Sequence, residues 1–147
     1  MTSIRELVDP LQTLPNIELV TRQYIEWDLD KMTRDKMDIM HNGETVGRCD
    51  IVSEMGASEP FAHFDGIEID EAVRRKGVGL AAYVLAIELS HERGLHFETQ
   101  NWSIRPGAKN IWELLARRGV AEIIVPFVPS KEYEGRVEGK LRVPFVD

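Results

Sequence analysis

The run Arg74-Arg75-Lys76-Gly77-Val78-Gly79 has the residue types and spacing that are needed to hold a phosphate group. It stands between a strand-like run, residues 64–69, and a helix-like run, residues 78–93. Glycine lets a backbone approach a ligand closely. The free N–H groups of a first helical turn point at that ligand, and the helix dipole favours negative charge there. The sequence therefore predicts that a phosphate-bearing cofactor binds at the start of this helix.

Two common phosphate-binding motifs are excluded, and a plain turn remains as an alternative. The dinucleotide fingerprint G-x-G-x-x-G fails because Gly79 is followed by Leu-Ala-Ala, and the nucleotide loop G-x-x-x-x-G-K-[ST] is absent. The remaining pattern is Arg74-x-x-Gly77-x-Gly79. A Gly-x-Gly pair before a helix also serves as ordinary turn chemistry. A structural or interaction protein is therefore the competing interpretation.

This pattern resembles the acetyl-coenzyme A signature R/Q-x-x-G-x-G/A of the GCN5-related N-acetyltransferases, the GNAT superfamily. Residues 66–82 resemble the strand-loop-helix unit of that family throughout, and the resemblance extends over residues 64–125. It implies that acetyl-coenzyme A is the co-substrate and that a primary amine accepts the acetyl group. The acceptor would be a small molecule or a protein or peptide, and GNAT proteins are often homodimers.

The resemblance also implies where the cofactor lies. In the family, the strand before the turn and the strand after its helix run parallel and then separate. The pantetheine arm bonds to the exposed backbone as an added strand, which here means the backbones of Ile67 and Ile69. Arg74 stands at the entry of the turn. The pyrophosphate is held by the N–H groups of five residues: Arg75, Lys76, Gly77, Val78 and Gly79.

Acyl transfer to an amine requires a group that takes up a proton. An amine with a pKa near 10 is mostly protonated at pH 7 and must become neutral before it attacks. Glu68 is the first candidate base, because it lies between Ile67 and Ile69, where the separation is expected to begin, and family members often carry a glutamate on this strand. A solvated strand glutamate is the alternative. Glu98, on the next strand, is the second candidate.

Two positions depart from the family pattern. The tyrosine of the second helix is replaced by Leu115, and Tyr133, in the late connection, is the candidate general acid in its place. The asparagine near the start of that helix falls at Ala108, so Asn101 and Asn110 are the nearby substitutes. These departures keep a second interpretation open: a GNAT-fold binding or regulatory module with lost or altered chemistry, including a different acyl donor or a nucleobase.

Composition limits the other possibilities. The 147 residues predict one domain over residues 1–147, and the net charge of -7 disfavours nucleic acid while it fits a cationic amine. The single cysteine, Cys49, excludes an intramolecular disulfide and is expected to be buried as a small hydrophobe. His63 and His91 are expected at the surface. No run reaches the roughly 18 apolar residues of a membrane helix, and we expect a cytoplasmic protein without a metal site.

Hydrophobic periodicity in the first half predicts an antiparallel meander. Apolar residues alternate over residues 25–29, and the runs 36–41 and 45–53 flank Asn42-Gly43, a strong hairpin signal. Residues 61–69 are typical of a further strand. The stretch between the first two strands is too short for the helical pair that the family usually has there. The acceptor site would then be open or completed by a second subunit.

The second half alternates between helices and strands. At the N-terminus, before the meander, a short helix is expected over residues 3–14. We expect an α/β fold with a GNAT-like mixed sheet: the antiparallel N-terminal meander, then β-α-β-α-β-β, with helices on both faces. The expected elements are a helix over 78–93, a strand over 95–99, a helix over 107–118, and strands over 120–126 and 140–146.

Overall fold

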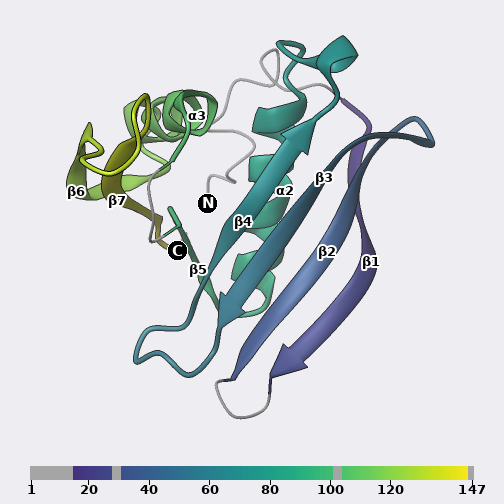
Figure 1. Cartoon of the computed structure of the whole chain (residues 1–147). Coiled ribbons are helices and arrows are strands. Elements are labelled where there is room, and N and C mark those ends of the chain that lie inside the picture. The colour runs from purple at the N-terminus through teal and green to yellow at the C-terminus, as the bar shows by residue number, and fades with distance from the viewer. Residues whose placement is uncertain (1–14, 28–30, 101–103, 146–147) are drawn as a thin grey trace.

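The computed structural model describes residues 15–27, 31–100 and 104–145, which form one seven-stranded sheet with helices packed against it (Figure 1). The strand order is β1-β2-β3-β4-β5-β7-β6. The helix predicted over residues 3–14 and the candidate Asn101 lie outside the described residues. The strands are β1 (Ile17–Trp27), β2 (Met32–His41), β3 (Glu44–Glu54), β4 (Phe61–Ile69), β5 (His96–Glu98), β6 (Glu122–Pro129) and β7 (Val137–Val143). The helices are the 3-10 turn η2 (Glu71–Val73), α2 (Val78–Glu92) and α3 (Pro106–Arg117).

Strands β1 to β4 form the predicted antiparallel meander. The hairpin between β2 and β3 turns at Asn42-Gly43, whose φ angles of 49° and 84° are both positive. A two-residue turn with that backbone matches the twist of the strands it joins, which is why the Asn-Gly pair is such a strong signal. β4 covers the whole run that the sequence predicted.

β1 is longer than its sequence pattern indicated. It begins at Ile17, and Ile17 is the only buried residue in the strand, so the alternation that marks a half-buried strand is missing. Trp27, at the end of the strand, is 42% exposed. β1 and β2 remain paired up to Trp27 and Met32. A hairpin therefore joins them, and the prediction that the family's helical pair does not fit here is confirmed.

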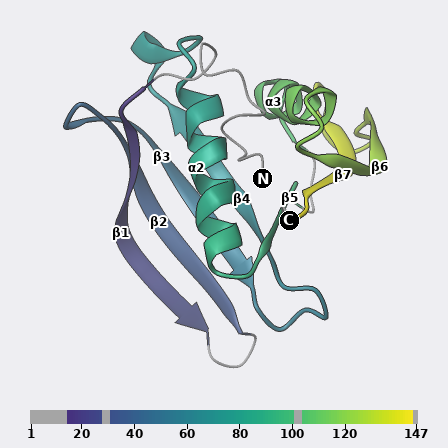
Figure 2. The same ribbon diagram turned by 180° about the vertical axis from the view of Figure 1, so that it is seen from behind.

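Both α-helices lie on the same face of the sheet, as the view from behind shows (Figure 2). The rings of Tyr83 in α2 and Trp112 in α3 are 5.9 Å apart, and both pack against Phe97 of β5, at 6.2 and 5.8 Å. Phe64 of β4 lies 5.4 Å from Phe97. The expectation of helices on both faces is therefore wrong for the described residues. We call the face opposite α2 and α3 the outer face.

The ends of the helices and of the last two strands can be compared with the ranges that the sequence predicted. Gly94 and Gly119 follow α2 and α3 with φ angles of 75° and 74°, the left-handed backbone that is common at a helix end. β6 and β7 extend further towards each other than predicted, so the connection is residues 130–136 instead of 127–139. Pro126 does not end β6, because an edge strand tolerates a missing N–H group.

Candidate functional site

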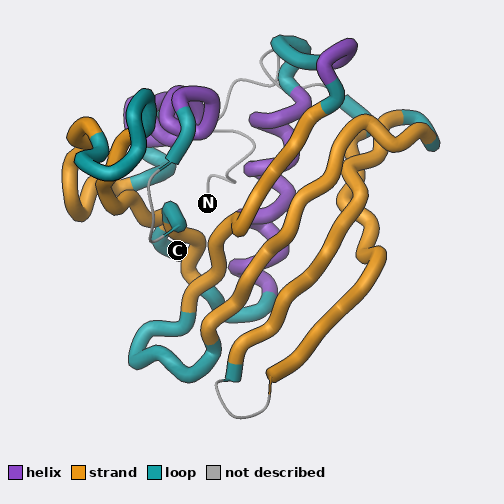
Figure 3. The backbone as a smooth tube through the Cα atoms, viewed as in Figure 1, coloured by secondary structure: helices purple, strands orange, loops and turns teal. Residues whose placement is uncertain are grey.

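β4 and β5 are paired at one end only. The parallel pairs are Phe61 with His96 and Ala62 with Phe97, and beyond them β5 pairs with β7 instead. Beyond Ala62, β4 remains paired with β3 on one edge as far as Ile69. Within the described residues, no strand pairs with its other edge, which faces β5. Figure 3 shows the two strands diverging. The separation thus begins after Ala62, well before Glu68, where it was expected.

A β-bulge in β4 bends the strand as it leaves β5. Ile51 of β3 faces Phe64 and Cys49 faces Ile67, so one residue of β3 stands opposite two residues of β4. One of those two is Gly66, whose φ angle of 114° is unsuited to other residues. A bulge increases the local twist and redirects the strand. A glycine inside a strand pattern is a sequence signal for such a bulge.

The backbone of Ile67 and Ile69 lies on the separated part of β4, as predicted. Both side chains are half-buried and pack against the core, which fixes the strand in place. Arg74 donates a hydrogen bond from Nε to the backbone oxygen of Ile69, at 2.9 Å. The turn is thereby tied to the end of β4. A strand edge without a partner can take up an extended ligand through backbone hydrogen bonds.

The turn between β4 and α2 presents several N–H groups without partners. Gly77 is the residue before the helix, with φ of 85°, and its oxygen accepts the first hydrogen bond of α2 from Ala81. Arg75 also has a positive φ angle, 65°. In the described part of the chain, the N–H groups of residues 75–80 donate no backbone hydrogen bond. Free donors at a helix start, where the dipole is positive, form an anion-binding arrangement.

The side chains of the turn differ in their roles. Val78 is 1% exposed and anchors the first helical residue in the core, whereas Arg75 and Lys76 are exposed. A Cβ atom added to Gly79 would stand 3.3 Å from Cδ1 of Ile111 in α3. Gly79 therefore allows α3 to pack against the first turn of α2. Asn110 precedes Ile111 and is exposed.

The two candidate carboxylate bases have opposite surroundings. Glu68 is exposed and faces Arg48 across the β3–β4 pair, and nothing in the described part of the chain engages its carboxylate. Glu98 is 1% exposed, and its two oxygens lie 3.2 Å from Lys140 Nζ and 3.4 Å from an Arg142 nitrogen. Both oxygens of Glu98 are thus already engaged by cations, and neither is open to an incoming amine.

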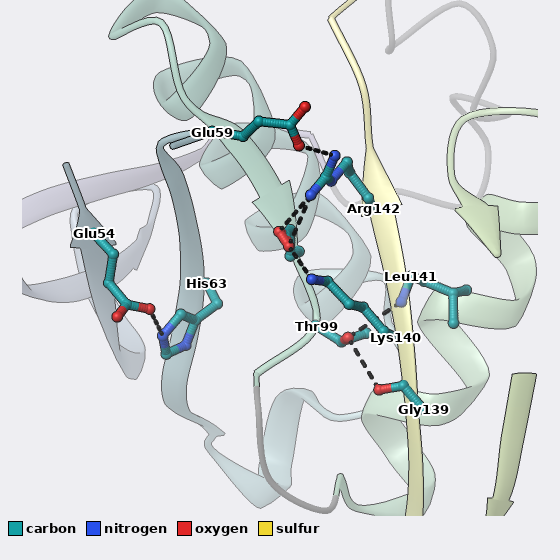
Figure 4. A network of polar contacts seen from close by, with 9 residues as sticks. Glu54, Glu59, His63, Thr99, Gly139, Lys140, Leu141 and Arg142 are labelled. Atoms are coloured by element: carbon teal, nitrogen blue, oxygen red, sulfur yellow. Dashed lines mark hydrogen bonds and ion pairs between the residues drawn. The ribbon is translucent and has the colours of Figure 1, made fainter. Parts of the chain in front are cut away.

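Arg142 joins three elements on the outer face. It bonds Glu59, in the β3–β4 loop, at 2.7 Å, and it also reaches Glu98 (Figure 4). Burial lowers the pKa of Arg142, but the hydrogen bonds and charges of Glu59 and Glu98 outweigh that effect and raise it overall. The guanidinium is therefore charged at every pH at which the protein is folded.

Tyr133 is not brought to the other candidates. It lies in the connection 130–136 with 49% of its surface exposed, and the guanidinium of Arg136 lies over its ring at 5.3 Å. Its N–H group bonds Ser130 Oγ at 3.1 Å. Leu115, at the place of the family tyrosine, is completely buried. Leucine has no proton to donate, and the contacts that the structure shows for Tyr133 lie within its own connection, residues 130–136.

His63 was expected at the surface, but it is buried. It is 8% exposed on the outer face of β4, stacked on Phe61 with ring centroids 6.1 Å apart. Its Nδ1 lies 3.2 Å from the oxygen of Phe64, and its Nε2 lies 3.8 Å from Oε2 of Glu54 in β3 (Figure 4). Its burial depends on contacts with neighbouring strands, and hydrophobic periodicity along one strand does not report those contacts.

Cys49 has the role that was predicted for it. The thiol is 2% exposed in the core, and burial, with smaller effects from Asp50, Asp35 and Asp38, raises its pKa to about 12. The thiolate, which is the nucleophilic form, is therefore not available near neutral pH.

Comparison with known proteins gives no family. No protein-family model matches the chain, and no curated protein matches it significantly. None of the helices in the described ranges is long and apolar enough to cross a membrane.

Proposed function

We propose that this protein is an acyl-coenzyme A dependent N-acyltransferase of the GNAT type, which moves an acetyl group from acetyl-coenzyme A to a primary amine. One observation carries the proposal. The unpaired edge of β4 beyond Ala62 leads directly to the turn in which the N–H groups of residues 75–80 have no backbone partners. A strand edge followed by an anion-binding turn suits a ligand with an extended arm and a diphosphate.

The cofactor would use both features at once. The diphosphate would accept hydrogen bonds from the N–H groups of residues 75–79, and the helix dipole would add about 0.5–1 kcal/mol for a well-placed anion. The pantetheine arm would run along β4 beside Ile67 and Ile69 towards Ala62, where the gap closes. Arg74 supports this path because it fixes the turn to the end of β4.

The strand order adds support. A meander followed by a parallel pair, β4 and β5, that encloses α2 is the arrangement that the GNAT resemblance implies. The chain departs from the family in the hairpin between β1 and β2, where the usual helical pair would form part of the acceptor site. Without that pair, the acceptor side is shallower, which suits a side chain on a protein or peptide as well as a small amine. We place the reaction in the cytoplasm.

The chemistry needs one proton acceptor. The ammonium group loses a proton, and its nitrogen lone pair attacks the thioester carbonyl. The C–N bond forms, the C–S bond breaks, and the second proton of the nitrogen passes to the thiolate or to water. Coenzyme A thiolate is a tolerable leaving group, so the burial of Leu115 in place of a tyrosine does not prevent the reaction.

Binding of acetyl-coenzyme A tests the proposal through Gly77→Val, with Gly94→Val as the matched control. Both glycines have a left-handed backbone, with φ of 85° and 75°, so each valine costs about 1–2 kcal/mol of stability. At 100 times the dissociation constant, the cofactor should stabilise the wild type and the control by about 2.7 kcal/mol, or about 5–10 °C in Tm. Gly77→Val should lose that shift. A shift retained by Gly77→Val, or absent from the wild type at millimolar cofactor, contradicts the proposal.

A binding module with altered chemistry is the second candidate. It is favoured by the engagement of Glu98 with two cations and by the absence of a tyrosine at Leu115. Such a protein would show the same thermal shift with acetyl-coenzyme A but would release no thiol with any primary amine in a panel. A nucleobase acceptor is disfavoured by the net charge of -7.

A further inference from the structure

The acceptor amine must approach the thioester from the outer face. The diphosphate end of the proposed cofactor lies at the wide end of the gap, so the thioester comes to the closed end, where Ala62 pairs with Phe97. On the helix side, that end is filled by the aromatic cluster described above, in which Phe64 and Tyr83 have ring centroids 4.7 Å apart. The side chains that can reach the reacting atoms are therefore those on the outer face beside Ala62.

His63 is the first residue of β4 beyond the last pair with β5, and its side chain lies on this face. Its Nδ1 faces the Phe64 oxygen at 3.2 Å, and a carbonyl can only accept, so Nδ1 carries the hydrogen. In the neutral ring, Nε2 is then a free acceptor that points towards Glu54. The 3.8 Å between Nε2 and the Glu54 oxygen is too long for a hydrogen bond.

Two acceptors at that separation suit a donor with several hydrogens. A primary ammonium group has three N–H bonds, so it can donate to Nε2 of His63 and to Oε2 of Glu54 at the same time. Histidine is also the side chain that most often takes up a proton as a general base in enzymes. Glu54 would stabilise the imidazolium that forms.

The other charged groups on this face are already occupied or misplaced. Asp65 lies in β4 two residues after His63, and it binds Arg34, which also binds Asp50. Glu98 of β5 is neutralised by Lys140 and Arg142 of β7 (Figure 4). Glu68 lies six residues beyond Ala62, which is about 20 Å along a strand, at the diphosphate end of the gap.

We propose that His63, oriented by the Phe64 carbonyl and paired with Glu54, is the catalytic base that takes the proton from the acceptor amine. The proposal rests on the acyltransferase function above. His63 Nε2 receives one proton from the ammonium group, and the neutral amine then attacks the thioester. The C–N bond forms as the C–S bond breaks, the second amine proton goes to the coenzyme A sulfur, and the imidazolium releases its proton to solvent. Glu54 is a positioning residue.

The test compares His63→Gln with His91→Gln. His91 is a matched control, because it also has a ring nitrogen 3.2 Å from a backbone oxygen, that of Val143, but it is half-buried and lies in the last turn of α2. Thiol release from acetyl-coenzyme A would be measured across a panel of primary amines and lysine peptides, with the best acceptor carried forward. At pH 7, His63→Gln should lower kcat by about 100-fold or more, and His91→Gln should not. Cofactor affinity should stay within about twofold in both, because neither position is in the diphosphate turn.

The pH profile separates a base from a merely structural residue. The defect of His63→Gln should shrink as the pH approaches the amine's own pKa of about 10, because the amine then deprotonates itself. Glu54→Gln should lower kcat by a smaller factor than His63→Gln, since the acceptor loses a charged partner beside the ring. A His63→Gln defect that is absent, or the same at every pH, overturns the proposal, as does a wild type that binds cofactor but acetylates no amine. Failure to bind acetyl-coenzyme A would instead refute the proposed function itself.

Discussion

The ion cluster around Glu98 gives the sharpest test of how the outer face is held together. Arg142→Met keeps the apolar stem of the side chain and removes its charge. Glu98 would then be left with Lys140 alone, whose nitrogen is 3.2 Å away but whose side chain is 42% exposed. Since Glu98 is 1% exposed, water cannot replace the lost partner.

The magnitude follows from these surroundings. Removing one partner of a fully buried pair costs about 3–5 kcal/mol. The Arg142 side chain is 17% exposed and Lys140 remains, so we expect about 2 kcal/mol for Arg142→Met. Glu98→Gln should cost about 1–2 kcal/mol, because Arg142 keeps Glu59 at 2.7 Å. The double variant should be more stable than the sum of the two predicts, by about 1 kcal/mol.

Urea unfolding at pH 7 measures each free energy. Arg48→Met is the matched control: its guanidinium lies 3.8 Å from Asp38, with 67% of the side chain exposed, and it should cost at most about 0.5 kcal/mol. A coupling energy below about 0.3 kcal/mol between the two sites would refute the reasoning. So would an Arg142→Met variant no less stable than Arg48→Met.

Two further predictions concern the α2 helix. The pKa of His91 is lowered by burial, partly offset by the hydrogen bond to Val143 and lowered further by His96, so the unfolded chain binds the proton better. Stability should therefore fall as the pH drops through about 6.5. His91→Gln should reduce the change in the urea unfolding midpoint between pH 7.5 and 5.5. An unchanged pH dependence in this variant would contradict the prediction. Gly79→Ala should change stability by less than about 1 kcal/mol, because helix propensity offsets the small displacement of Ile111. Its acetyl-coenzyme A affinity, measured by calorimetry, should match the wild type because alanine keeps the backbone N–H group, and a tenfold loss would contradict this reasoning.

The elements that the sequence predicted well are those specified by neighbouring residues. The Asn42-Gly43 turn requires two positive φ angles, and the backbone has them. Gly94 and Gly119 end their helices for the same local reason. The start of α2 at Val78 follows from the glycine before it and the apolar spacing after it.

The features that were missed depend on residues far apart in the chain. Asp65 pairs with Arg34 of β2 on the outer face because the Gly66 bulge alters the alternation along β4. His63 is buried by its contact with Phe61 and its position beside Glu54 in β3. β1 lacks a buried side after Ile17, so its only periodic signal was the alternation that begins at residue 25, near its end. Each of these needs the sheet order before it can be inferred.

The gap between β4 and β5 is formed from both sides. The Gly66 bulge turns β4 away from β5, and β5 pairs with β7 instead. Thr99, directly after β5, donates its N–H group to the Leu141 oxygen at 3.0 Å, and its hydroxyl accepts the Leu141 N–H group at 3.2 Å. Thr99 is 3% exposed, so these two hydrogen bonds to β7 are shielded from water. The glycine turn accounts for the diphosphate end of the proposed site, but its thioester end is specified by one glycine and one threonine outside that motif. A search for the motif alone would therefore recover the anchor of the proposed cofactor and miss the residues that would determine where its thioester lies.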